Sequence, residues 1–343
     1  MGNTVVSIAN DAFAINNVPV NKGRTCEGAS IEGLLFNSRM AQGIFDDRNP
    51  ETIHLWAYPD THVWDPDRNT QEFVQAMSSW REKGLLAFTI CLQGGCPRGY
   101  CLTQPWHNSA INADGSLDPA YMVRLERIVT RADELGMVVI LSYFYFGQEK
   151  RLPDEAAIVR ATDSATDWVL DRQYTNVVIE VNNECNIIYT HSVLTPHRVH
   201  ELIARVQNRS AARGARLPVS VSYGGGTLPG DEVMRISDFL LVHGNHVDPA
   251  GIEEMIRMIR RQPAYRGQPI VFNEDDHFDF ENDDNNFIRA TRCHASWGYL
   301  DLGYNNYHDG FQCPPVNWRI NTRRKKDFFA FMEWMTTGRS RWE

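Results

Sequence analysis

The sequence lacks the signatures of several large protein classes. No run approaches the roughly 18 apolar residues that cross a bilayer, so we expect no membrane-spanning helix. No C-x-x-C pair occurs, which argues against a structural zinc site. Neither a G-x-G-x-x-G loop nor a Walker motif follows the first predicted strand. We therefore expect neither a metal nor an organic cofactor.

A secretory leader is also missing. Residues 1–20 have neither a basic start nor a long apolar run, and Val6 departs from the myristoylation pattern. A cytoplasmic protein and a secreted protein whose leader has been removed both fit this beginning, so the compartment stays open.

Basic residues are outnumbered in this chain. There are 34 Lys and Arg against 43 Asp and Glu, which gives a formal net charge of -9. Nucleic acids and anionic membrane surfaces both select a basic face, so we expect neither as a partner. The charge suits a neutral or cationic substrate or simply solubility, and the oligomeric state stays open.

The seven cysteines do not predict a disulfide framework, because an odd number is spread over a long chain. Cys96 and Cys101 share one Gly- and Pro-rich loop, GGCPRGYC. We expect free thiols, with a Cys96–Cys101 bridge as the alternative in an oxidising compartment.

What the sequence does contain is an alternation of short apolar runs and charged amphipathic stretches, which is typical of βα units. Most of the runs are continuously apolar, as in parallel strands buried on both faces. The runs cover residues 32–37, 85–92, 137–144, 176–182, 217–223, 238–244, 269–274 and 297–303.

The intervening segments predict helices. The clearest is 118–136, where Asp118 can cap the first turn, Pro119 suits the first helical position and Gly136 suits the end. Residues 195–214 and 251–261 show similar apolar spacing.

Eight strand–helix repeats predict the α/β class and a (β/α)8 (TIM) barrel. An open doubly wound sheet is the alternative, disfavoured by the missing Gly-rich loop. We expect one catalytic domain over 1–343, with residues 1–30 forming an N-terminal hairpin that caps the barrel. Long loops at 45–70, 93–117 and 304–322 would then lie on the C-terminal face, where barrel active sites form.

Two glutamates stand at the ends of predicted strands: Glu184 in VVIEVNNEC and Glu274 in PIVFNEDD. Side chains two residues apart share a face of a strand, so both carboxyls should emerge at the mouth of the barrel and face each other. The residues expected to share their faces are Val178, Glu180 and Asn182 for Glu184, and Ile270 and Phe272 for Glu274. Glycosidic bond cleavage uses such a pair, with retention at about 5–5.5 Å and inversion at about 6.5–9.5 Å.

Asn183-Glu184 after the fourth strand and Glu274 after the seventh resemble clan A of the glycoside hydrolases, the retaining barrels that include cellulases, mannanases and β-galactosidases. The layout spans about 30–330, and 116–141 resembles the second-helix, third-strand segment of the clan. The resemblance implies Glu184 as acid/base and Glu274 as nucleophile. It also implies that Asn183 hydrogen-bonds the sugar 2-hydroxyl and the nucleophile, and that the substrate is a β-linked oligo- or polysaccharide.

The chain departs from the clan at two places. Cys185 follows the expected acid/base where clan members carry Pro or a small residue. Many members have Trp at the end of the eighth strand, whereas Tyr304 is nearest that end here, so we expect Tyr304 or Trp318 to supply the aromatic floor of the sugar site.

Two further residues should reach the mouth. His243 ends the sixth strand, where the clan often has His or Tyr that orients the nucleophile; a satisfied core histidine is the alternative. Arg39 ends the first strand, and it can pair with Glu274 or with the otherwise buried Glu180.

The loop QPWHNS places Trp106, His107 and Asn108 together after the second strand. An aromatic face beside polar groups is suited to sugar binding, since CH groups stack on the ring while hydroxyls take hydrogen bonds. A loop anchored by one buried Trp is the alternative.

Two rival functions stay open. A metal-dependent barrel hydrolase could use His243, His246 and the acidic segment 274–284, although the first strand has no His-x-His. A non-catalytic carbohydrate-binding barrel is disfavoured because both glutamates are present. The sequence does not specify the sugar, the linkage, or endo against exo action.

Overall fold

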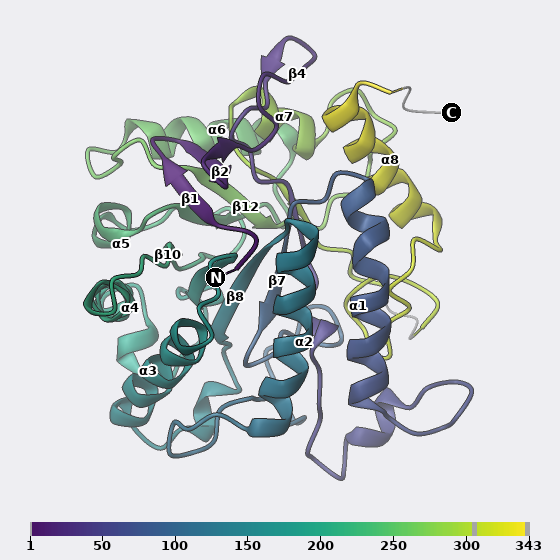
Figure 1. Cartoon of the computed structure of the whole chain (residues 1–343), viewed down its shortest axis with the longest axis vertical. Coiled ribbons are helices and arrows are strands. Elements are labelled where there is room, and N and C mark those ends of the chain that lie inside the picture. The colour runs from purple at the N-terminus through teal and green to yellow at the C-terminus, as the bar shows by residue number, and fades with distance from the viewer. Residues whose placement is uncertain (1, 304–306, 340–343) are drawn as a thin grey trace.

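The computed structural model describes residues 2–303 and 307–339, and it confirms the predicted (β/α)8 barrel (Figure 1). Each barrel strand coincides with or overlaps one of the eight predicted apolar runs. Within the described residues the barrel strands are β6 (Asn37–Arg39), β7 (Ala87–Cys91), β8 (Val138–Phe144), β9 (Val177–Asn182), β10 (Val219–Ser220), β11 (Leu240–His243), β12 (Ile270–Glu274) and β13 (Gly298–Tyr299).

Parallel pairing runs around the ring in the order β10-β9-β8-β7-β6-β13, with β11 and β12 as a separate pair. Two contacts close the ring. A parallel bridge joins Val271 of β12 to Ser296, just before β13. The Asp238 N–H, just before β11, donates to the Val219 carbonyl of β10 at 3.0 Å. All eight carboxyl ends therefore open on one face.

Helices wrap the outside of this ring (Figure 1). Within the described residues they are α1 (Pro66–Glu82), α2 (Pro119–Leu135), α3 (Glu155–Asp171), α4 (Val199–Ala212), α5 (Asp231–Ile236), α6 (Pro249–Arg261), α7 (Asn286–Arg292) and α8 (Arg323–Thr337), with 3-10 turns η1 (Ala41–Gly43), η2 (Ile53–Trp56), η3 (Glu149–Arg151) and η4 (Ser192–Leu194). None of these helices is long and apolar enough to cross a membrane.

Helix α2 begins and ends as its sequence predicts. The Asp118 carboxylate accepts the Tyr121 N–H at 2.8 Å, and Gly136 closes the helix with a left-handed φ of 69°. The helix predicted over 195–214 begins later, at Val199, because residues 196–198 form a turn, and its N-cap Arg198 makes no side-chain capping bond.

The first predicted strand is displaced. Only Asn37 of the run 32–37 belongs to β6, because the preceding backbone pairs with the N-terminal segment instead. Gly33 donates to the Val20 carbonyl and accepts from Phe13, and its φ of 83° is one that glycine adopts freely.

The N-terminal segment forms a three-stranded antiparallel sheet of β1 (Val6–Ala9), β2 (Ala12–Ile15) and β3 (Val18–Pro19); a two-stranded ribbon of β4 (Thr25–Cys26) and β5 (Ala29–Ser30) follows. A turn at Asn16-Asn17, within the predicted N-terminal hairpin, joins β2 to β3, with φ values of 53° and 64° that match a type I′ hairpin. This three-stranded sheet packs against the inward-pointing side chains at the N-terminal ends of the barrel strands. This cluster contains Val6, Phe13 and Val20 with Leu35, Val138, Val178, Phe239 and Val271.

The side chains of β12 do not all point in the directions predicted from strand alternation. Ile270 and Phe272 pack outward into the layer between strands and helices, whereas Val271 points into the barrel. Pairing then skips one residue, since Val242 opposes Phe272 and His243 opposes Glu274. This β-bulge reverses the alternation and turns Glu274 inward although Phe272 points outward.

We expect Phe13→Ala to lower the free energy of unfolding by about 3–5 kcal/mol, because its fully buried ring contacts Phe239 edge-on at 5.7 Å and a cavity would remain. Val18→Ala, at a half-exposed position of the same sheet, should change it by less than about 0.5 kcal/mol. Urea denaturation followed by tryptophan fluorescence compares the two. Equal losses would contradict the packing of this sheet as the base of the barrel.

Candidate active site

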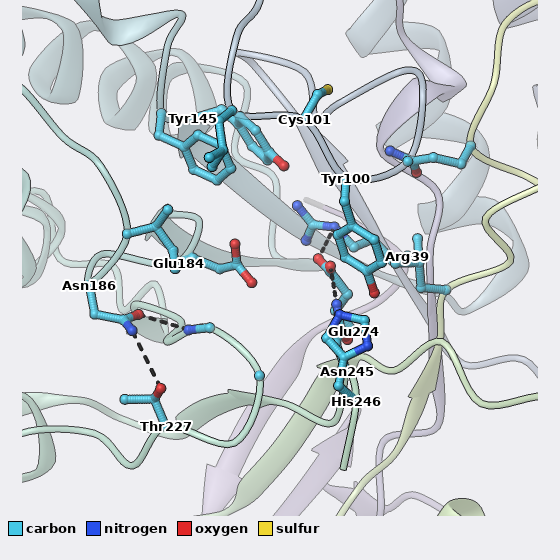
Figure 2. A pocket seen from close by; sticks show the side chains of 18 residues that line it. Arg39, Tyr100, Cys101, Tyr145, Glu184, Asn186, Thr227, Asn245, His246 and Glu274 are labelled. Carbon is cyan, nitrogen blue, oxygen red and sulfur yellow. Dashed lines mark hydrogen bonds and ion pairs between the residues drawn. The ribbon is translucent and has the colours of Figure 1, made fainter.

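A pocket of about 360 Å³ opens at the carboxyl ends of the strands (Figure 2). Its walls come from all eight strand ends and the loops that follow them. The lining residues include Arg39, Tyr100, Leu102, Tyr145, Phe146, Glu184, Asn186, Ile187, Gly224, Thr227, Asn245, His246, Glu274 and Leu300.

Glu184 and Glu274 reach into this pocket from opposite sides (Figure 2). One carboxylate oxygen of each lies, together with a ring nitrogen of His243, within 4.8 Å of the other two atoms. Glu274 is buried and Glu184 is partly exposed. The two carboxyls are thus close enough to act on the two sides of one small group.

Both oxygens of Glu274 are held by buried donors. Arg39 Nε lies 2.6 Å from Oε2, and Asn245 Nδ2 donates to Oε1 at 2.8 Å. Burial opposes the charge of Arg39, but the neighbouring carboxylates, above all Glu274, outweigh it and raise the pKa of the guanidinium above its ordinary value. Glu274 therefore faces a permanent positive charge.

Arg39 also approaches the second carboxylate considered for it, because its Nη1 lies 3.7 Å from Glu180 Oε2. Glu180 is fully buried and accepts from Asn273 Nδ2 at 3.3 Å. Arg39 therefore bridges a deep carboxylate and one in the pocket, and its contact with Glu274 is the shorter.

The chain turns sharply where it presents Glu184. Glu184 has a left-handed φ of 48°, which is uncommon for a residue with a side chain. The loop after β10 holds the turn: Ser222 Oγ accepts the Glu184 N–H at 2.9 Å, and the Ser222 carbonyl accepts the Cys185 N–H at 3.0 Å. A strained backbone that its surroundings fix in place is typical of functional sites.

His243 points into the site and lies closer to Glu184 than to Glu274. Its Nδ1 is 3.0 Å from Glu184 Oε1 and 3.8 Å from Glu274 Oε2. Burial by itself lowers the pKa of His243, but the charge of Glu274 and the hydrogen bond to Glu184 outweigh it, so the pKa is raised above the ordinary value. The imidazole of His243 is therefore hydrogen-bonded to Glu184 and favoured in its protonated form.

Asn183 does not make the contact with Glu274 that the resemblance implies, because Asn245 donates there instead. Asn183 is fully buried, and neither polar atom of its amide has a hydrogen-bond partner among the described residues. Buried amides are usually satisfied, so this group is available to a bound molecule or water.

Several pocket residues escaped the sequence reasoning, among them Asn245, Tyr145 and Tyr100. Asn245 stands two residues after His243, so the same alternation could have found it. Tyr145 directly follows β8 and lines the pocket. Tyr100 lies in the loop after β7 that a Cys96–Cys101 disulfide closes, and its hydroxyl donates to Asp276 at 2.8 Å.

The loop residues predicted to bind sugar instead anchor the loop. Trp106 is buried in a cluster with Phe45 and Trp56, and its ring contacts Trp56 edge-on. Asn108 is fully buried, where its Oδ1 accepts the Asp46 N–H at 3.2 Å. The buried-anchor alternative therefore describes this loop.

His107 belongs to the same anchor, since its backbone N–H donates to Asp47 Oδ1 at 2.8 Å. Trp318 also lies away from the pocket: it is buried between Phe73 and Phe311, and its indole N–H donates to Asn69 at 3.0 Å. Burial of its ring contradicts the expected contact with a sugar. Tyr304 lies outside the described residues.

Two sets of side chains have the composition of a metal site, Glu184 with His243 and Glu274, and Asp275–His277. The guanidinium of Arg39 already supplies a positive charge to the first set. In the second, Asp275 Oδ2 accepts from the side chains of Trp297 and Asn286, both at 2.8 Å, and its Oδ1 accepts from His277. These contacts favour organic acid–base chemistry over metal ligation.

No family model and no curated protein matches this chain. Solved structures do. A Bacteroidetes-affiliated GH5 cellulase linked with a polysaccharide utilization locus is 13% identical, with a TM-score of 0.56 over 90% of this chain and 92% of that one. A glycoside hydrolase family 5 enzyme from Prevotella bryantii B14 is 12% identical, with a TM-score of 0.57 over 89% and 96%.

An endo-1,4-beta-mannanase from Rhizomucor miehei is 10% identical, with a TM-score of 0.53 over 86% of this chain and 89% of that one. At such identities the likeness concerns the path of the chain and not its chemistry. The protein shares with these enzymes a (β/α)8 barrel that spans nearly the whole of each chain.

Proposed function

We propose that the protein is a retaining glycoside hydrolase, with 1–343 as one catalytic domain, Glu274 as nucleophile and Glu184 as acid/base. The observation that carries this proposal is the placement of two carboxylates with oxygens within 4.8 Å of each other at the mouth of the barrel. Retaining glycosidases place their carboxyls about 5–5.5 Å apart, whereas inverting enzymes need about 6.5–9.5 Å for an intervening water.

In the first step Glu274 attacks the anomeric carbon while Glu184 gives its proton to the glycosidic oxygen, so the bond to the leaving alcohol breaks. In the second step Glu184 takes a proton from water, which displaces Glu274 and releases the sugar. Arg39 and Asn245 suit Glu274 to the attack because they hold its two oxygens and fix its orientation.

His243 acts in this proposal as a positioning residue for Glu184, to which it is hydrogen-bonded. Asn183 is assigned to the sugar 2-hydroxyl, since its buried amide has no partner in the described part of the chain. Tyr100 and Tyr145 line the pocket together with the two carboxylates, and we assign them the place foreseen for Trp106 and Trp318.

A β-linked oligo- or polysaccharide is the proposed substrate. Two of the similar solved structures are a cellulase and an endo-1,4-beta-mannanase. A third is a beta-glucosidase from Exiguobacterium marinum, which is 10% identical to this chain. A panel of aryl β-glycosides and polysaccharides, assayed with EDTA present, identifies the sugar. Loss of activity with EDTA would favour the metal-dependent alternative.

We expect Glu274→Gln to lower kcat by at least about a thousandfold, because the amide cannot attack the anomeric carbon while the side chain keeps its size. Release of nitrophenol from the best aryl glycoside measures the loss. Glu281→Gln removes an exposed carboxylate nearby and should leave the rate unchanged. Equal rates for wild type and Glu274→Gln would refute the assignment.

We expect Glu184→Ala to retain activity on 2,4-dinitrophenyl glycosides, whose leaving group needs little protonation, but to lose it on alkyl glycosides. Azide should restore the rate by entering the space that the carboxylate vacated and yield a β-glycosyl azide. The experiment measures the ratio of the rates on the dinitrophenyl and alkyl glycosides, and NMR gives the configuration of the azide product. An equal loss on both substrates would contradict the acid/base role.

We expect the stabilising effect of His243 to depend on pH. Its pKa is raised in the folded protein, so its contribution is complete below the unfolded pKa of about 6.5 and is lost as the pH rises through the folded value. The Tm difference between wild type and His243→Gln should therefore be largest near pH 6 and shrink towards pH 9. His54→Gln, at an exposed position, is the control; a Tm difference that stays constant with pH would count against a raised pKa of His243.

A further inference from the structure

The mouth of the pocket exposes aliphatic side chains. Leu102 is 66% exposed and Ile187 is 37% exposed, and both line the pocket together with the ring of Phe146. Large apolar side chains grouped at a concave site are typical of a surface that a ligand covers.

Ile187 lies on the Glu184 side of the pocket, and the segment that follows Leu102 lies beside Phe146, because Gln104 Nε2 donates to the Phe146 carbonyl at 2.8 Å. A Cβ built on Gly224 would lie 3.1 Å from Ile187 Cδ1 and 3.5 Å from Glu184 Oε1, so the aliphatic chain and the carboxylate meet at one corner. The backbone ties them further, since the Ile187 N–H donates to the Glu184 carbonyl at 2.9 Å. The group beside the acid/base is by necessity the leaving group of the reaction.

The polar side chains at this corner are engaged with one another. Asn186 Oδ1 accepts the Gly224 N–H at 2.8 Å, and Asn186 Nδ2 donates to Thr227 Oγ1 at 3.4 Å (Figure 2). A second sugar in this position would leave many of its hydroxyls without partners, which lowers affinity. An aliphatic group has no hydrogen bonds to lose there, and its contact with Leu102 and Ile187 favours binding.

We propose that the leaving-group subsite accepts an aliphatic alcohol, so that the preferred substrates are glycosides with an apolar aglycone. This inference rests on the proposed function and narrows its substrate class. The glycone lies towards Arg39, Asn245 and Glu274, and the alkyl chain lies against Leu102, Phe146 and Ile187.

The experiment compares methyl, butyl and octyl β-glycosides of the sugar that the aryl panel identifies, with the corresponding disaccharide alongside. These alcohols differ little in acidity, so their rates differ through binding. A buried CH2 group contributes about fourfold, and we expect kcat/KM to rise at least about tenfold from methyl to octyl, with most of the change in KM. A rise that ends at butyl indicates a short-chain alcohol, and one that continues to octyl indicates a lipid chain.

Leu102→Ser and Ile187→Ser should each reduce the octyl-to-methyl ratio of kcat/KM by about fourfold or more, since each removes apolar surface from the subsite. Ile188→Ser is the matched control, because Ile188 is 54% exposed next to Ile187 but does not line the pocket. Its ratio should equal that of wild type.

Two outcomes overturn the inference: a disaccharide cleaved with a higher kcat/KM than the octyl glycoside, or Leu102→Ser and Ile187→Ser ratios equal to that of wild type. Both leave the glycosidase itself intact. Failure of the proposed function looks different, because wild type would then hydrolyse none of the aryl glycosides, or Glu274→Gln would be as active as wild type.

Discussion

The buried ion pair between Arg39 and Glu274 is the contact on which the mouth of the barrel depends. A guanidinium that is 2% exposed is stable only when carboxylates compensate it, and Glu274 and Glu180 flank it at 2.6 Å and 3.7 Å. Because Arg39 and Asn245 engage both oxygens of Glu274, the carboxylate is confined to one orientation. That orientation sets its distance from Glu184 across the pocket.

A local irregularity in β12 makes this pair possible. A regular strand would point Asn273 and Glu274 to opposite faces, but the skipped pairing opposite His243 lets both reach the interior. Asn273 then satisfies the deep carboxylate of Glu180, while Glu274 reaches the pocket. One bulge thus provides both a compensated core charge and a carboxylate in the pocket.

Some aromatic residues of the loops above the strands are buried in packed clusters, and others line the pocket. Trp56 and Trp106 form a buried cluster that shapes the loop after β7, and Trp318 packs against Phe73 and Trp80 of α1. The pocket itself receives Tyr100 and Tyr145 together with aliphatic side chains. Arg39 and Asn245 hold Glu274, whereas Ile187 lies beside Glu184, so the two glutamates meet different environments.

The sequence alone determined the fold and the chain positions of the two glutamates, because apolar runs alternating with amphipathic segments specify eight βα units whose carboxyl ends meet. Strand alternation also predicts the inward direction of Arg39 and His243. Tertiary structure decided what local periodicity does not encode. The bulge before Glu274, the exchange of Asn183 for Asn245 as its donor, and the burial of Trp106 and Trp318 all depend on residues distant in sequence. An aromatic side chain in a loop has the same local pattern whether it is buried or exposed, and only the packing of the other loops against it distinguishes the two.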